Sequence, residues 1–184
     1  MYVEYPRTYL DFTLGVHFTM KRTYPLLALM SLCLPLILSA ENPASLKDFT
    51  WTLPGELKLG LVHLNDTTTP IIFQPPTLYS IRARAHSNTM FYVQGTPDRN
   101  VQMDTTNFSL EQNGETITGV PTSIKHFEKG RVSVSRGDRI EGLLTFDKLA
   151  DVSQPFTIRH GSDSVQIKFT RDQMKATMPA TEAK

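Results

Sequence analysis

Cysteine is nearly absent from this chain of 184 residues, which contains only Cys33. A single cysteine cannot form an intrachain disulfide, and it cannot build a cysteine metal site. Cys33 also lies in an apolar stretch that we expect to be removed from the mature protein. The mature chain would then have no cysteine, so its stability has to come from a packed hydrophobic core.

An excess of either charge is also lacking. Three of the nineteen Lys and Arg residues and two of the eighteen Asp and Glu residues lie before residue 41, which leaves sixteen of each in the rest of the chain. A domain that binds nucleic acid or an anionic membrane surface usually carries a basic surplus. We therefore expect no nucleic-acid partner.

Motifs that would name a catalytic activity are missing too. The sequence has no Gly-x-Ser-x-Gly elbow to present a serine nucleophile. Imidazole and thioether groups could bind copper, and after residue 40 they include His63, His86, His126, His160, Met90 and Met103. No two of these histidines have the spacing of a local ligand pair. The carboxylates Asp98, Asp104 and Glu111 lack the spacing of a calcium loop. We expect no enzyme activity, no cofactor and no metal site.

What the sequence does contain is an export signal. Residues 20 to 43 read MKRTYPLLALMSLCLPLILSAENP, in which Lys21 and Arg22 precede an apolar run from Pro25 to Ser39. A membrane-spanning helix needs about 20 apolar residues, so this run is better suited to a secretory signal peptide. We predict a signal-peptide helix over residues 20–40 that is cleaved after Ala40. The working protein is then exported, periplasmic or extracellular, and keeps no permanent membrane span.

Residues 1–19 precede this signal and have two explanations. Either translation begins at Met20 and Met1 is a mis-assigned start, or the signal peptide has a long n-region. Both explanations leave residues 41–184 as the mature chain, which is long enough to form one core without disulfides.

Period-two alternation of apolar and polar residues dominates the mature chain and predicts short strands with one buried face. The alternating apolar sets are Leu57, Leu59 and Leu61; Tyr79, Ile81, Ala83 and Ala85; Ile140, Gly142, Leu144 and Phe146; Phe156 and Ile158; and Val165, Ile167 and Phe169. The pair Asn113-Gly114 predicts a tight hairpin between residues 107–112 and 116–120. Eight to ten short strands at these spacings are typical of an all-β antiparallel sandwich.

Domain boundaries follow from composition. We predict a lead-in segment over residues 41–55, one β-sandwich domain over residues 56–170, and a mobile or weakly helical tail over residues 171–184. Within the domain, residues 64–77 are rich in Pro, Thr and Asn and are predicted to form a loop. They include the glycosylation sequon Asn65-Asp66-Thr67.

The segment RGDRIEGLLTFDKLADVSQPFTIRHGSDSVQIKF, residues 136–169, resembles the closing strands of secreted bacterial immunoglobulin-like domains of unknown function. Those domains carry a turn glycine and a Gly-x-x-x-x-Gly-x-x-x-Phe strand, matched here by Gly137, Gly142 and Phe146. The resemblance implies an immunoglobulin-like β-sandwich in an extracytoplasmic setting, and it brings no catalytic residues.

Two functional hypotheses follow. The first is a non-catalytic interaction or structural module of the cell envelope that binds a protein partner. Its candidate contact residues are Tyr79, Arg82, Arg84 and Tyr92, which would give one sheet face aromatic and arginine side chains. The alternative is a small ligand- or metal-binding protein, or an unrecognised enzyme, with its site in loops 64–77 and 95–106.

Overall fold

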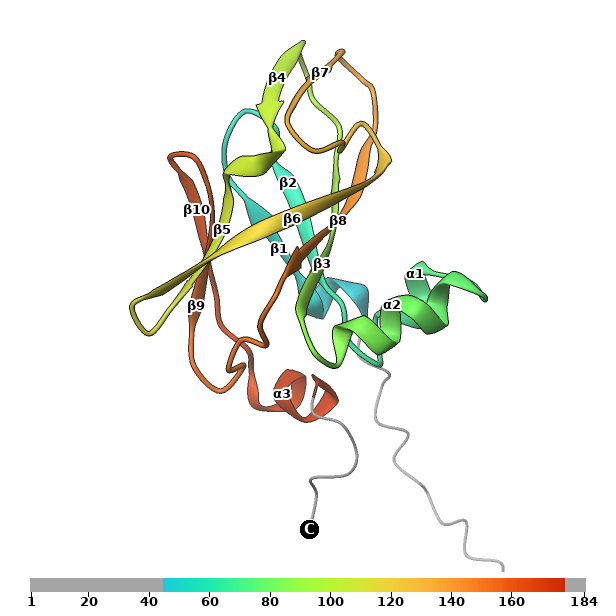
Figure 1. Ribbon diagram of the computed structural model, residues 1–184, viewed down its shortest axis with the longest axis vertical. Coiled ribbons are helices and arrows are strands. Elements are labelled where there is room, and N and C mark those ends of the chain that lie inside the picture. The colour runs from blue at the N-terminus through green and yellow to red at the C-terminus, as the bar shows by residue number, and fades with distance from the viewer. Residues whose placement is uncertain (1–44, 178–184) are drawn as a thin grey trace, which may run out of the picture. The chain divides into compact units, whose positions relative to one another are not determined.

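The computed structural model of the chain describes residues 45–177 (Figure 1). The predicted signal peptide, the residues before it and the tail from residue 178 lie outside this part of the chain. Within it, the fold is mostly antiparallel β-structure with few helices, so the all-β prediction is confirmed. The strands are β1 (Thr50–Leu53), β2 (Leu59–His63), β3 (Thr89–Gly95), β4 (Val101–Asp104), β5 (Phe108–Gln112), β6 (Glu115–Lys125), β7 (Arg131–Val134), β8 (Ile140–Phe146), β9 (Phe156–His160) and β10 (Asp163–Ile167). The helices are η1 (Leu46–Phe49), α1 (Thr69–Ile72), α2 (Thr77–Ala85), η2 (Thr105–Asn107) and α3 (Arg171–Thr177).

Eight strands form one continuous sheet in the order β1-β2-β3-β8-β6-β5-β9-β10, and β4 pairs with β7 in a separate two-stranded sheet. Strand β6 joins the two halves of the large sheet, because Glu115 to Thr118 pair with β5 whereas Gly119 to Lys125 pair with β8. Its long diagonal course is visible in Figure 1. Strands β1 and β10, at the two ends of the order, also contact each other. The sheet is therefore curved and nearly barrel-like.

The predicted hairpin is present at the junction of β5 and β6. Gln112 pairs with Glu115, and the two residues between them both have positive φ, 52° at Asn113 and 79° at Gly114. This is the backbone that an Asn-Gly pair adopts most readily in a two-residue turn. The sequence predicted the hairpin and the identity of its turn residues.

The main core lies inside the curved sheet, and a second, smaller core lies on the outside of β2, β3 and β8. The main core contains the buried aromatic side chains Phe49, Phe91, Phe108, Phe127, Phe146, Phe156 and Phe169. The outer core consists of Val62, Leu64, Ile81, Met90, Tyr92 and Leu143. Ile81 comes from α2, which thus covers this outer face. Strands β3 and β8 are buried on both faces as a result.

The predicted strand over residues 79–85 is wrong, because these residues belong to helix α2. Pro76 stands at the N-cap, and the following TLYSIRARA segment is rich in Leu, Arg and Ala, which are strong helix formers. The alternation of apolar residues at 79–85 does not mark a buried strand face, because Ile81 is the only residue of α2 that is buried. Of the residues predicted to form one sheet face, only Tyr92 lies on a strand, β3.

Other predicted segments contain helices or strands. The predicted loop 64–77 contains α1, the predicted lead-in 41–55 contains η1 and β1, and α3 occupies the start of the tail. The large sheet therefore begins at Thr50, before the predicted domain boundary. The antiparallel pairing of its strands supports the all-β fold class, whereas the immunoglobulin-like arrangement stays a prediction. No helix within residues 45–177 is long and apolar enough to cross a membrane.

Gly142 on β8 lies against the buried ring of Phe127. A Cβ atom at this position would come within 2.2 Å of Phe127 Cδ1. The change Gly142→Ala should lower the free energy of unfolding by about 2 kcal/mol, because the overpacked core has to shift. Urea denaturation would measure it.

Gly60→Ala on β2 is the matched control, since its added Cβ would meet no atom closer than Gln94 Cγ at 3.4 Å. This control should change the free energy of unfolding by less than about 0.5 kcal/mol. Equal losses for the two variants would show that the Gly142–Phe127 contact does not limit the packing of β8.

Candidate functional site

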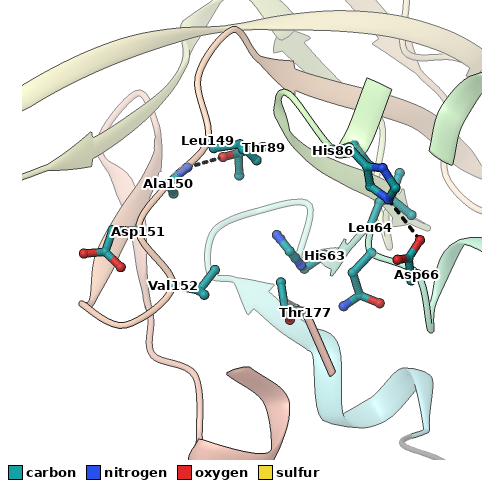
Figure 2. Close-up of a pocket in the computed structure, with 12 residues that line it drawn as sticks. His63, Leu64, Asp66, His86, Thr89, Leu149, Ala150, Asp151, Val152 and Thr177 are labelled. Atoms are coloured by element: carbon teal, nitrogen blue, oxygen red, sulfur yellow. Dashed lines mark hydrogen bonds and ion pairs between the residues drawn. The ribbon is translucent and has the colours of Figure 1, made fainter. Parts of the chain in front are cut away.

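A pocket of about 430 Å³ lies where β2 ends and β3 begins (Figure 2). Three segments surround it: the end of β2 with the turn after it, the end of α2 with the start of β3, and the loop after β8. Thr177 of α3 also contributes. We call this the His63 pocket; its lining residues are His63, Leu64, Asn65, Asp66, Ala85, His86, Thr89, Leu149, Ala150, Asp151, Val152 and Thr177.

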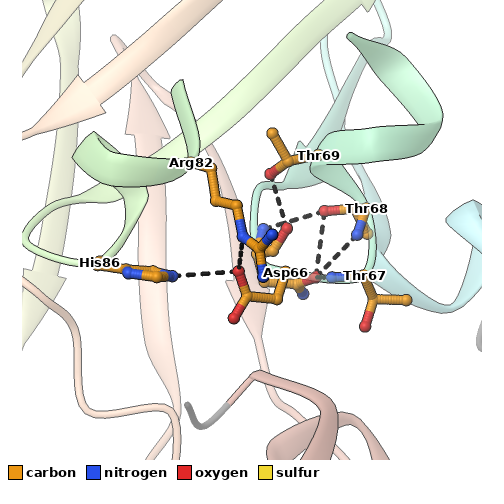
Figure 3. Close-up of polar contacts among 7 residues, drawn as sticks. Asp66, Thr67, Thr68, Thr69, Arg82 and His86 are labelled. Atoms are coloured by element: carbon orange, nitrogen blue, oxygen red, sulfur yellow. Dashed lines mark hydrogen bonds and ion pairs between the residues drawn. The ribbon is translucent and has the colours of Figure 1, made fainter. Parts of the chain in front are cut away.

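The turn after β2 is held by the side chains of an Asn-Asp-Thr-Thr-Thr segment. Asn65 Oδ1 accepts hydrogen bonds from the backbone N–H groups of Thr67 at 2.8 Å and Thr68 at 2.9 Å. Thr68 Oγ1 donates to the carbonyl of His63 at 2.7 Å, and Thr69 Oγ1 donates to the carbonyl of Asn65 at 2.6 Å. Asn and Thr side chains commonly close turns in this way. These bonds fix the position of Asn65, and Figure 3 shows Thr67, Thr68 and Thr69 of the turn.

Two buried polar atoms at this turn have no hydrogen-bond partner within the described part of the chain. They are His63 Nδ1 and Asn65 Nδ2, and both residues line the pocket. His63 is 6% exposed and Asn65 is 5% exposed. A buried polar group without a partner typically lowers stability by about 1–3 kcal/mol, so such groups are rare and call for an explanation.

His63 lines the pocket and is also packed among aromatic rings. Its ring centroid lies 5.4 Å from that of Phe91 and 5.1 Å from that of Phe169, both in edge-on geometry. Burial among these groups disfavours the charged imidazolium and lowers the pKa of His63 to about 4. His63 is therefore a neutral imidazole at pH 7, able to use Nδ1 as a donor or an acceptor according to its tautomer.

Asp66 connects the turn to helix α2 (Figure 3). Its Oδ1 accepts a hydrogen bond from Arg82 Nε at 2.5 Å and lies 3.1 Å from His86 Nε2. The hydrogen bond from Arg82 is the main reason that the pKa of Asp66 lies below its usual value. Asp66 and these two α2 side chains keep the end of the helix beside the pocket.

The loop after β8 forms the opposite wall and is attached to Thr89 at the start of β3. Thr89 Oγ1 donates to the carbonyl of Lys148 at 2.8 Å. It also accepts from the N–H of Ala150 at 2.7 Å, the bond drawn in Figure 2. Asp151 accepts hydrogen bonds from the backbone and hydroxyl of Ser153, which lower the pKa of Asp151. These contacts present Leu149, Ala150 and Val152 to the pocket.

The pocket has an acidic and apolar lining. Asp66 and Asp151 contribute carboxylates, whereas no lysine or arginine is among the described residues that line it. Within residues 45–177, no three His, Cys, Asp or Glu side chains come together in a way that could hold a metal ion. The lining thus combines carboxylate, imidazole and amide groups with apolar side chains.

The four residues predicted to contact a partner do not share one surface. Tyr79 is 65% exposed on α2, whereas Tyr92 is 8% exposed in the outer core. Arg82 pairs with Asp66, and Arg84 Nη2 donates to Thr145 Oγ1 of β8 at 3.2 Å. The two arginines thus attach α2 to the rest of the domain. The prediction that Arg82 and Arg84 share one face of a strand is therefore wrong.

Sequence reasoning placed the alternative site in loops 64–77 and 95–106, and the structure brings only the start of the first loop to the pocket. His63 was considered only as one of several possible copper ligands, and Asn65 only as part of a glycosylation sequon in the loop 64–77. The available signal was the Asn-Asp-Thr-Thr-Thr turn directly after an apolar strand that ends in histidine. Its connection to residues 149–152 depends on the pairing of β3 with β8, which sequence alone did not give.

Protein-family models, curated proteins and solved structures were compared with this chain, and none of them matches it. The function of the pocket has to be argued from its own chemistry.

The pKa of His63 makes a pH dependence of stability testable. In the unfolded chain this histidine takes up a proton below about pH 6.5, whereas in the folded chain it does so only below about pH 4. The unfolded state binds more protons between these values, so stability falls as the pH decreases through this window. The full loss attributable to His63 is about 3 kcal/mol.

Denaturation of the wild type and of His63→Phe from pH 7 to pH 4.5 would measure this loss. Phenylalanine keeps an aromatic ring beside Phe91 and Phe169 but has no titratable group. The carboxylates with lowered pKa values, such as Asp66 and Asp151, affect stability mainly below this range. Identical pH slopes for the two proteins would contradict a buried, neutral His63.

Proposed function

We propose that this chain is a non-catalytic binding protein that holds one small organic molecule in the His63 pocket. The observation that carries this proposal is the presence of two buried, unpartnered polar atoms, His63 Nδ1 and Asn65 Nδ2, in the lining of a single pocket. Small-molecule sites are typically concave and largely apolar, with a few polar groups that orient the ligand. A volume of about 430 Å³ falls in the usual range for such sites.

The contacts of the titratable groups support binding rather than catalysis. Asp66 is engaged by Arg82 and His86, and Asp151 by Ser153. The rings of His86 and His160 hydrogen-bond to oxygens of Asp66 and Asp104, and in residues 45–177 no histidine ring bonds to a hydroxyl group. A nucleophile with an adjacent base is the usual signature of covalent catalysis.

The setting we propose is outside the cytoplasm, in an exported domain of the immunoglobulin-like kind. Support comes from the sequence alone: the basic, apolar and small-residue order of residues 20–40, and the strand pattern of residues 136–169. The mature chain would carry the pocket in the cell envelope or beyond it.

Blocking the pocket tests the proposal. Amide NMR spectra of the full-length protein would be recorded with a library of small organic fragments. Binding should shift signals from residues 63–66, 85–89 and 149–152. Ala150→Phe places a ring in the pocket lining and should abolish these shifts, because the ring competes for the same space.

Thr116→Phe is the control for that variant, since it adds the same ring at an exposed position of β6 that does not line the pocket. Shifts that persist in Ala150→Phe, or that map elsewhere in both variants, would contradict a ligand site at His63.

A second candidate function is the binding of a protein partner in the envelope through helices α1 and α2. The observation in its favour is that two large apolar side chains on these helices are exposed, Ile71 at 52% and Tyr79 at 65%. Tyrosine is frequent among residues that dominate binding energy at interfaces. Arg82 and Arg84 would act here by holding α2 in place.

Cross-linking in the native envelope tests this second function. Replacing Ile71 and Tyr79 together by alanine should reduce recovery of a near-stoichiometric partner at least fivefold, which is roughly the loss expected from 1 kcal/mol of binding energy. Val120→Ala, at a comparably exposed apolar residue on β6, is the control. Equal recovery from the double variant and the control would exclude α1 and α2 as the contact surface.

A further inference from the structure

The turn around Asn65 determines which atom of its side-chain amide has no hydrogen-bond partner among the described residues. Asn65 Oδ1 accepts two backbone N–H groups, at 2.8 and 2.9 Å, and only an oxygen can do so. Nδ2 is therefore the end of the amide without a partner among the described residues. Its N–H groups can donate but cannot accept, so a ligand at this position has to supply an acceptor.

The charge of that acceptor is restricted by the rest of the lining. Asp66 and Asp151 are carboxylates, and no described lysine or arginine lines the pocket to balance a ligand anion. His63 is neutral at pH 7 because burial lowers its pKa. Its Nδ1 can donate to a ligand oxygen in one tautomer and accept from a ligand hydroxyl in the other. An anionic ligand would lie beside two carboxylates, of which Asp66 is paired with Arg82 and Asp151 has no cationic partner among the lining residues.

Apolar side chains define the remainder of the ligand. Leu64, Leu149 and Val152 line the same pocket, and Leu149 is 53% exposed. An apolar ligand body would cover part of this surface.

We infer that the ligand of the His63 pocket is an uncharged molecule with an apolar body, whose hydroxyl or carbonyl oxygen accepts a hydrogen bond from Asn65 Nδ2 beside His63 Nδ1. This inference rests on the proposed function and specifies the chemical class that the pocket selects. Asn65 determines specificity through its donor, and the turn residues Thr67 and Thr68 hold that donor in place.

Four probes with one apolar body and different head groups test this specificity. They are hexanol, hexanamide, hexanoate and hexylamine, titrated into the full-length protein at pH 7 and followed by amide NMR. Hexanol and hexanamide supply an uncharged oxygen acceptor. They should bind at least about fivefold more tightly than hexanoate, which is anionic, and hexylamine, whose ammonium has no acceptor.

The variant Asn65→Asp should reverse this preference among the probes. Aspartate keeps an oxygen for the N–H groups of Thr67 and Thr68, so the turn is retained, but its outer oxygen cannot donate as the amide does. Binding of hexanol and hexanamide should fall by about fivefold, and hexylamine should become the preferred probe. Asn65→Ser, which also retains a turn oxygen and removes the amide donor, serves if the aspartate variant is unfolded.

The outcomes separate this inference from the proposed function. If all four probes bind the wild type equally and Asn65→Asp changes the binding of none of them, the pocket is a ligand site. The inference that its ligand must supply an uncharged oxygen acceptor is then wrong. Preference for hexanoate would likewise overturn the inference while leaving the pocket in place. If no probe binds, water alone satisfies the two atoms, and both the inference and the proposed function fail.

Discussion

Burial of β3 and β8 on both faces is the constraint on which the rest of this structure depends. Phe91 and Phe146 point into the main core, whereas Tyr92 and Leu143 belong to the outer core. An antiparallel sheet often leaves one face to solvent, but here the outer face needs a cover. Helix α2 supplies it with Ile81, and it is attached through Arg84 to Thr145 and through Arg82 to Asp66.

The His63 pocket forms because the chain has to place α2 over the outer face of the sheet between β2 and β3. The chain leaves β2, forms the turn at Asn65 and passes through α1 and α2 before it returns as β3. The loop after β8 is attached to Thr89 at the start of that strand. These segments meet around a space that none of them fills, and His63 and Asn65 are among the residues that line it. The same connections that stabilise the outer core therefore position the groups that we propose bind a ligand.

Much of the sheet was predictable from sequence because its signals are local. The Asn113-Gly114 hairpin needs two neighbouring residues that tolerate positive φ, and the strand around Ile158 alternates plainly. Helix α2 was mistaken for a strand because a short helix that buries one residue, Ile81, shows no helical period. The pocket could not be predicted, because it depends on long-range contacts between residues that are far apart in the chain.

Native mass spectrometry of the protein purified from its own cells is the most direct test of a ligand site at His63 and Asn65. We expect one small, uncharged, oxygen-containing molecule bound at about one per chain, released on unfolding and absent from Ala150→Phe purified in parallel. Wild-type protein that carries no such molecule, or carries the same molecules as the blocked variant, would contradict a ligand site at His63 and Asn65.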